Sequence, residues 1–176
     1  KKKKINFIRI REPGGNSNSE KIRNLILSKK NKFNPFTDLL LYLAARSENI
    51  EKVISKNYKK KIILLDRFTD STLAYQHYGM NLDKNLIEDV NKALLKKIKP
   101  SVVFLNIVNM NNLTKRLKLR KKKNRYDNFK IKFYKKVQNG FIKLSKNKSN
   151  YEVVNSNENL NKNKKKVLDK IIKLIN

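Results

Sequence analysis

The chain has 176 residues, and its 44 Lys and Arg residues against 14 Asp and Glu residues give a formal net charge of +30. That length fits one domain with a single hydrophobic core, and a hydrophobic content of 39% with eight Phe and seven Tyr excludes a wholly disordered polycation. The absence of Cys excludes disulfides, the single His argues against a histidine-built metal site, and the longest apolar run, residues 39–45, is too short to span a membrane. We therefore expect a soluble, cytoplasmic domain.

Short apolar runs alternate along the chain with longer amphipathic stretches. The strands predicted from this pattern cover residues 5–10, 62–65, 101–108 and 151–154. The predicted helices cover residues 19–27, 35–57, 69 onward, 83–97, a stretch through Leu113 and Leu117, 128–144 and 160–175. Ser19 and Asn34 are the expected N-caps of the first two helices. This alternation indicates an α/β fold, with a parallel sheet covered by helices on both faces.

The charge of +30 suggests a nucleic-acid partner, because Lys and Arg neutralise phosphates. However, only eight of the 44 cations are Arg, and the Lys residues are spread along the chain among many Asn and Ile, as AT-rich codons produce. We therefore expect the charge to reflect composition, and nucleic acid not to be a specific partner. A non-catalytic, basic nucleic-acid-binding protein remains the alternative.

A first candidate for chemistry lies at the end of the predicted strand 62–65. Asp66 occupies the position from which a phosphate-transfer enzyme holds Mg²⁺, and Arg67 offers a planar fork for phosphate oxygens. A polar stripe follows on the next helix, made of Ser71, Thr72, Tyr75 and Gln76. The alternative is an Asp-Arg surface pair that ends a strand.

A second candidate lies on the predicted helix 35–57. Asp38, Tyr42 and Arg46 are spaced i, i+4 and i+8, and therefore share one face of the helix. A Tyr and an Arg in line can stack on a planar base and hydrogen-bond to its edge. The alternative is a half-buried Tyr beside a surface Arg.

Two further clusters point to anions. The Arg-Glu-Pro-Gly-Gly segment at 11–15 joins a strand to a helix N-terminus, where anions are favoured, and Arg23 follows about one turn into that helix. The basic segment 120–126 contains Arg120 and Arg125, and Arg116 lies one helical turn before it. Arginines that approach a transferring phosphoryl group stabilise its negative charge. An ordinary turn and a solvated basic loop are the respective alternatives.

In their order and spacing, these motifs resemble the thymidylate kinase family, which transfers a phosphoryl group from ATP to dTMP. The resemblance rests on Arg-Glu-Pro-Gly-Gly at 11–15, Glu-Lys-Ile-Arg at 20–23, Leu-Ala-Ala-Arg at 43–46 and the segment 66–76, and it covers nearly the whole chain. It implies a P-loop-kinase-like parallel sheet, a single nucleotide kinase domain over residues 1–176 with a lid at 120–126, Mg²⁺ as cofactor, dTMP and ATP as substrates, and a homodimer.

The resemblance also implies roles for individual residues. Asp66 would help to hold Mg²⁺, and Arg67 would bridge the donor and acceptor phosphates. Arg120 and Arg125 would belong to the lid that closes over ATP. The dTMP site would consist of Arg23 at the phosphate, Tyr42 stacked on thymine, Arg46 and Thr72 at the edge of the base, and Pro13, Tyr75 and Gln76 around the deoxyribose.

The chain departs from the family at several places. His-Tyr-Gly-Met-Asn at 77–81 replaces a Gly-rich stretch with an Arg, and Asn106 and Asn124 stand where Asp is usual. No Gly-x-x-x-x-Gly-Lys-Ser/Thr loop, which would hold the ATP phosphates, occurs in the sequence. In the family's fold, the strand before that loop lies between the strands 61–65 and 101–107. We therefore expect a fragment with its N-terminal ATP-binding unit missing and with little activity by itself; another deoxynucleotide or deoxynucleoside kinase is the alternative.

Overall fold

The computed structural model describes residues 5–146 and 148–175, and it confirms the predicted alternation of strands and helices. No helix in these ranges is long and apolar enough to cross a membrane. In chain order the elements are β1 (Phe7–Arg11), α1 (Ser17–Leu27), α2 (Pro35–Asn49), the π-helical η1 (Ile50–Ile54), α3 (Ser55–Asn57), β2 (Ile62–Asp66), α4 (Thr69–Thr72), the π-helical η2 (Leu73–Gly79), α5 (Lys84–Leu95), β3 (Val103–Ile107), α6 (Met110–Lys118), the 3₁₀ turn η3 (Arg125–Asn128), α7 (Ile131–Ser145), β4 (Tyr151–Asn155) and α8 (Leu160–Ile175).

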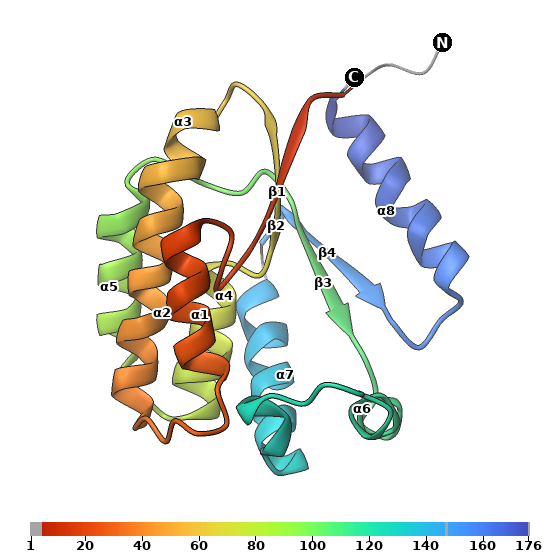
Figure 1. Ribbon diagram of the computed structural model, residues 1–176. Helices are drawn as coiled ribbons and strands as arrows, with labels where there is room; N and C mark the ends of the chain where they lie inside the picture. The colour runs from red at the N-terminus through yellow and green to blue at the C-terminus, as the bar shows by residue number, and fades with distance from the viewer. Residues whose placement is uncertain (1–4, 147, 176) are drawn as a thin grey trace.

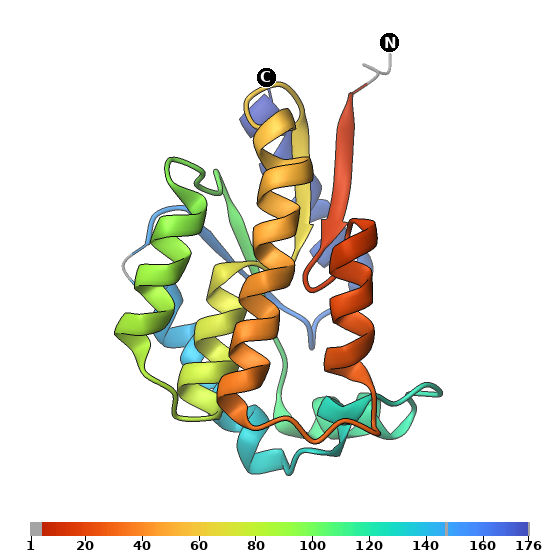
Figure 2. The ribbon, with the colours of Figure 1, turned by 60° about the vertical axis from the view of Figure 1, so that its left-hand side comes forward.

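The predicted helix 35–57 is one continuous helical rod, formed by α2, η1 and α3 (Figure 2). As predicted, Asn34 caps it, because its side chain accepts a hydrogen bond of 2.8 Å from the Thr37 N–H. The predicted cap of α1 is wrong: Asn16 takes that role, and α1 begins at Ser17. Ser19 is instead buried against α2 and donates its hydroxyl to the Ala45 carbonyl at 2.8 Å, a long-range contact that local spacing does not reveal.

The predicted helix 128–144 begins three residues later than expected, because Asn128 ends the short turn η3 instead. Asn124 and Asp127 form a reciprocal capping box that closes the short turn η3. Phe129 and Lys130 are then extended, so that α7 begins only at Ile131. The boundary differs from the prediction because this local polar turn competes with the helical pattern around it.

The strands form two separate parallel pairs, β1–β2 and β3–β4. The registers place Arg11 beside Asp66 in the first pair and Ile107 beside Asn155 in the second. The parallel α/β class is therefore confirmed. Within the described ranges, however, β2 and β3 pair with no strand other than β1 and β4, so each keeps an unpaired edge.

Helices cover the first pair on one face. In Figure 1, α1, α2 and α5 lie on one side of β1–β2, whereas α8 lies on the far side of the second pair. Isoleucines from β1, β2 and η1 form an apolar cluster on the covered face, with Ile10, Ile50 and Ile54 buried at its centre. On the opposite face, Phe7 is 54% exposed and Leu64 is 39% exposed. Helices therefore lie on both sides of the strands, while the outer face of β1–β2 stays partly exposed.

A second apolar core joins α2, η2, α5 and α7. Its buried members are Leu39, Leu43, Leu73, Ala74, Ile87, Val137 and Leu144. Two glycines allow α7 and η2 to approach closely: a Cβ atom at Gly140 would lie 2.5 Å from the Tyr78 ring, and one at Gly79 would lie 2.7 Å from Phe133. This packing fixes the helix that carries residues 73–79.

The turn after β1 is held by backbone conformation and by one buried amide. Gly14 and Gly15 have φ angles of +116° and +111°, which side-chain-bearing residues rarely adopt. Asn49 donates to the Gly14 carbonyl at 2.6 Å, which ties the turn to the end of α2. The Gly15 N–H and Arg11 bind Glu20 and lower the pKa of its carboxyl, although partial burial acts in the opposite direction.

A buried ion pair joins the same turn to the middle of α2. The Nε and Nη2 atoms of Arg46 each lie 2.8 Å from Oε2 of Glu12, and Arg46 Nη1 donates to Asn91 Oδ1 at 2.7 Å. Arg46 is 2% exposed and Glu12 is 5% exposed. The pair therefore connects β1, α2 and α5 out of contact with water. By contrast, the neighbouring Arg11–Glu20 pair, at 3.1 Å, lies in solvent.

Replacing Gly15 with Ala is expected to destabilise the protein by about 1–3 kcal/mol. The left-handed φ would be strained, and the new methyl group would lie 2.5 Å from Ile10 Cγ2. Urea unfolding measures the change. Ser17→Ala, at an exposed position at the start of α1, is the control and should alter the free energy of unfolding little; equal stability of Gly15→Ala and the wild type would contradict this account.

The two ion pairs give a matched comparison. Arg46→Met leaves the Glu12 carboxylate buried without a counter-ion and should cost about 3–5 kcal/mol. Arg11→Met removes an exposed pair and should cost less than about 1 kcal/mol. Both values come from denaturant midpoints at pH 7. Similar losses in the two variants would show that burial of the Glu12–Arg46 pair is not what matters.

Candidate active site

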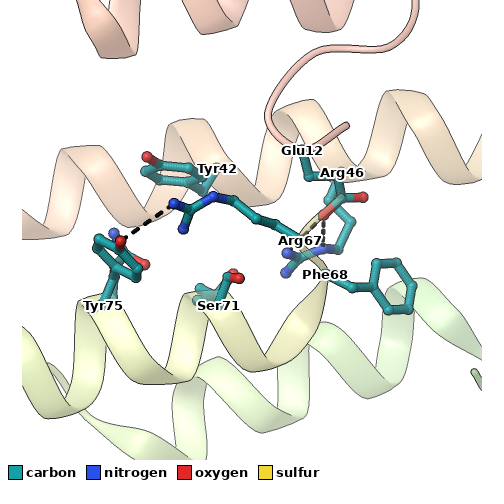
Figure 3. Close-up of a pocket in the computed structure, with 9 residues that line it drawn as sticks. Glu12, Tyr42, Arg46, Arg67, Phe68, Ser71 and Tyr75 are labelled. Carbon is teal, nitrogen blue, oxygen red and sulfur yellow. Dashed lines mark hydrogen bonds and ion pairs between the residues drawn. The ribbon is translucent and has the colours of Figure 1, made fainter. Parts of the chain in front are cut away.

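A cavity lies between α2 and the helix formed by α4 and η2 (Figure 3). Its free interior is about 20 Å³, and the space rises to about 240 Å³ when the open mouth is counted. Nine residues line it: Glu12, Tyr42, Arg46, Arg67, Phe68, Ser71, Thr72, Tyr75 and Gln76. They come from three segments that are far apart in the sequence, and all three contain a motif singled out from the sequence.

Six of the eleven predicted site residues line this cavity: Tyr42, Arg46, Arg67, Thr72, Tyr75 and Gln76. The other three lining residues were not predicted as site residues. Ser71 belongs to the polar stripe that the sequence predicted, although no role was assigned to it; Glu12 lies within a predicted motif, but nothing in its spacing indicates that it reaches the cavity. Phe68 carried no signal of its own; its ring lies 5.6 Å from the Arg46 guanidinium carbon, so it packs against the buried cation.

The two walls of the cavity present aromatic rings to each other. Tyr42 comes from α2, and Tyr75 comes from the π-helical η2. The Arg67 side chain runs between them, with Nη2 3.3 Å from the Tyr75 hydroxyl and the guanidinium carbon 4.9 Å from the Tyr75 ring centroid (Figure 3). Arg67 has a φ of +68°, a strained conformation for a long side chain, which persists because β2 and α4 fix the chain on both sides.

Buried polar atoms without partners gather around this cavity. In residues 5–146 and 148–175, four buried side-chain atoms have no hydrogen-bond partner: Glu12 Oε1, Thr72 Oγ1, Gln76 Nε2 and Asn91 Nδ2. The first three belong to lining residues, and the fourth belongs to the partner of Arg46. Because such atoms cost about 1–3 kcal/mol each when they stay unpaired, they mark a site shaped for a polar ligand.

Asp66 lies outside this cavity, one residue before Arg67. It lines a second, open hollow with Arg9, Ile10, Arg11, Gly15 and Glu20, and its carboxylate is exposed. In the described part of the chain, no group of three or more acidic, His or Cys side chains could hold a metal. One accessible carboxylate nevertheless fits Mg²⁺, which proteins commonly hold by one or two carboxylates together with substrate phosphates.

Pro13 and Arg23 form a pair beside the cavity. Arg23 Nη1 donates to the Pro13 carbonyl at 2.6 Å, and Pro13 directly follows the lining residue Glu12. Partial burial, with Arg11 nearby, lowers the pKa of Arg23. Neither Pro13 nor Arg23 lines either hollow. Their predicted roles at the deoxyribose and the phosphate stay predictions.

The two lid arginines lie apart from both hollows. Arg120 pairs at 2.5 Å with Asp127, the residue that directly follows the predicted lid segment. Arg125 pairs at 2.5 Å with Asp38, which is buried at the start of α2. In this arrangement the end of the predicted lid segment 120–126 is tied to α2, and a role of either arginine over ATP stays a prediction.

Comparisons with known proteins show the family of the chain. The family model for thymidylate kinase matches residues 1–167. The thymidylate kinase of Wolbachia sp. subsp. Brugia malayi is 38% identical over 143 residues, which are 81% of this chain and 67% of that protein. That of Mycoplasma capricolum subsp. capricolum is 35% identical over 170 residues, 94% of this chain and 78% of its own length.

A solved structure gives the same result. The crystal structure of thymidylate kinase from Ehrlichia chaffeensis matches 94% of this chain, and 80% of its own, with a TM-score of 0.73 and 29% sequence identity. The range matched by the family model, residues 1–167, includes all the segments that build the cavity. The chain therefore belongs to the thymidylate kinase family.

Proposed function

We propose that this chain carries the acceptor site of an enzyme that transfers a phosphoryl group from ATP to dTMP, giving dTDP. The observation that carries the proposal is the cavity with aromatic walls and three unpartnered buried polar atoms. Thymine is flat, and one edge of it presents an N–H group with one carbonyl oxygen on each side. An aromatic wall together with unpaired donors and acceptors is the environment that such a base needs.

In this proposal, each lining group has a part in binding dTMP. The Tyr42 ring stacks on the base, and the Gln76 amide donates from Nε2 to a thymine carbonyl. Thr72 Oγ1 takes up a second hydrogen bond at the edge of the base. Arg46 uses three of its five N–H groups on Glu12 and Asn91, which leaves two for the base.

The phosphate end of dTMP would extend toward Arg67 and Asp66. The Arg67 side chain would move away from the Tyr75 hydroxyl and contact the phosphates. Arg23 would bind the acceptor phosphate. Asp66 would hold Mg²⁺, which, when bound, neutralises negative charge on the donor phosphates. Because a phosphate oxygen needs no strong base to attack, the contribution of these residues is alignment and charge neutralisation.

The site for the ATP phosphates is proposed to be completed by a strand and a Gly-rich loop that are not among these 176 residues. The unpaired edges of β2 and β3 support such a strand. The exposed face of β1–β2, with Phe7 and Leu64, and the exposed Leu168 and Ile172 of α8 support a covering element that would follow it. In the completed site, Arg120 and Arg125 would belong to the lid over ATP.

A homodimer that packs through the long helix is also part of this proposal. Phe36 and Leu40 lie exposed on α2, where an interface between two copies would cover them.

Gln76→Leu should weaken dTMP binding at least about tenfold, because it removes the buried Nε2 donor while keeping most of the side-chain volume. Titration calorimetry with the 176-residue chain measures the affinity. Gln138→Leu, a matched change on α7 outside the cavity, should leave the affinity within about twofold. A panel of dTMP, dUMP, thymidine and dCMP distinguishes the related kinases; stronger binding of another member, or no effect of Gln76→Leu, would contradict the proposed site.

Turnover should depend on the missing phosphate loop. A coupled ADP-release assay with dTMP and ATP should detect little or no activity for the 176-residue chain. The same chain extended by the residues encoded upstream of Lys1 should be active, provided that they contain the Gly-rich loop. Equal and robust turnover by both proteins would overturn the proposal that a loop outside this chain holds the ATP phosphates.

A further inference from the structure

Tyr126, the last residue of the predicted lid segment 120–126, forms part of the wall behind the candidate base site. Its ring packs edge-on against two residues that line the cavity: the centroid distance is 6.2 Å to Tyr42 and 6.1 Å to Tyr75, at interplanar angles of 79° and 70°. Tyr126 is itself buried. The ring proposed to stack on thymine is therefore supported from behind by a residue more than 80 positions away.

The buried carboxylate of Asp38 holds Tyr126 in place. The Tyr126 hydroxyl donates to Asp38 Oδ2 at 3.1 Å, and Arg125 Nη2 donates to Asp38 Oδ1 at 2.5 Å. Asp38 precedes Tyr42 by one turn of α2, so the anchor and the ring that it affects are on the same helix face. Burial raises the pKa of the Tyr126 hydroxyl, which therefore stays protonated and able to donate at neutral pH.

Contacts from three other elements fix the backbone around Tyr126. Arg125 Nε donates to the Ile26 carbonyl at the end of α1 at 3.0 Å, and the Tyr134 hydroxyl of α7 donates to the Tyr126 carbonyl at 2.6 Å. The capping box of Asn124 and Asp127 closes the turn itself. Tyr126 is thus held rigidly against the cavity wall, as a residue that orients a neighbour must be.

We propose that Tyr126 is a positioning residue for the base-stacking ring of Tyr42, and that the Asp38–Arg125 pair connects the lid segment to the base site through it. The inference rests on the proposed function, because it assigns the stacking role to Tyr42. In the part of the chain that the structure describes, the Tyr126 side chain packs against the aromatic walls and hydrogen-bonds to Asp38, with no hydrogen bond to Arg23, Arg67 or Asp66, so it should affect recognition of the base more than recognition of the phosphate.

The experiment is a double-mutant cycle on nucleotide affinity, measured by calorimetry with the 176-residue chain. The probes are dTMP and 2-deoxyribose 5-phosphate, which lacks the base. Tyr126→Leu should weaken dTMP about fivefold to tenfold and the sugar phosphate less than twofold. In a Tyr42→Ala background, Tyr126→Leu should lose most of its effect, because the stacking ring is gone and only the contact of Tyr126 with Tyr75 remains.

Two more variants keep the test independent of folding. Tyr126→Phe keeps the ring and loses only the hydroxyl bond to Asp38, so it should bind dTMP better than Tyr126→Leu and still below the wild type. Tyr58→Leu, on a tyrosine that does not line the cavity and whose hydroxyl donates to the Lys97 carbonyl, is the control and should change neither affinity.

Equal losses for dTMP and the sugar phosphate, or additive effects in the cycle, would overturn this inference while the proposed function stands. Failure of the wild-type chain to bind dTMP would overturn both. If Tyr126→Leu does not fold, a second cycle with Tyr126→Phe and Tyr42→Ala decides the question. Additive effects in that cycle overturn the inference. Loss of the Tyr126→Phe effect in the Tyr42→Ala background supports it.

Discussion

The buried ion pair between Glu12 and Arg46 is the interaction on which the arrangement of the site depends. It joins the turn after β1 to the middle of α2, and Asn91 extends the connection to α5. Because a buried charge without its partner is very unfavourable, separating the two segments would cost a large free energy. Tyr42 lies one helical turn before Arg46, so the same pair sets the distance between the turn and the aromatic wall of the cavity.

The walls of the cavity built on this frame belong to two helices that are packed in the core, so their backbone is fixed. The Arg67 side chain is the part that a ligand stacked on Tyr42 would displace. The strained backbone of Arg67, at the junction of β2 and α4, places a long cation between the two tyrosine rings. Stability is given up at these positions, as is common where a fold carries function.

The two hollows differ in how far the chain encloses them. The proposed acceptor site is enclosed by α2, η2 and the turn after β1, whereas Asp66 faces an open hollow at the end of β2. Among the described residues, β2 and β3 also have unpaired edges. Backbone groups of a parallel sheet normally pair on both sides, so this asymmetry affects stability as well as donor binding.

The sequence by itself determined the α/β class, the long helix with its Asn34 cap, and six of the cavity residues, because these follow from local spacing, capping chemistry and recognisable motifs. Only the tertiary structure decided that Ser19 is buried instead of capping, that the strands form two pairs, and that Arg125 binds Asp38. Each of these depends on contacts between segments far apart in the chain. Hydrogen bonds and ion pairs of this kind are set by packing, which no local pattern encodes.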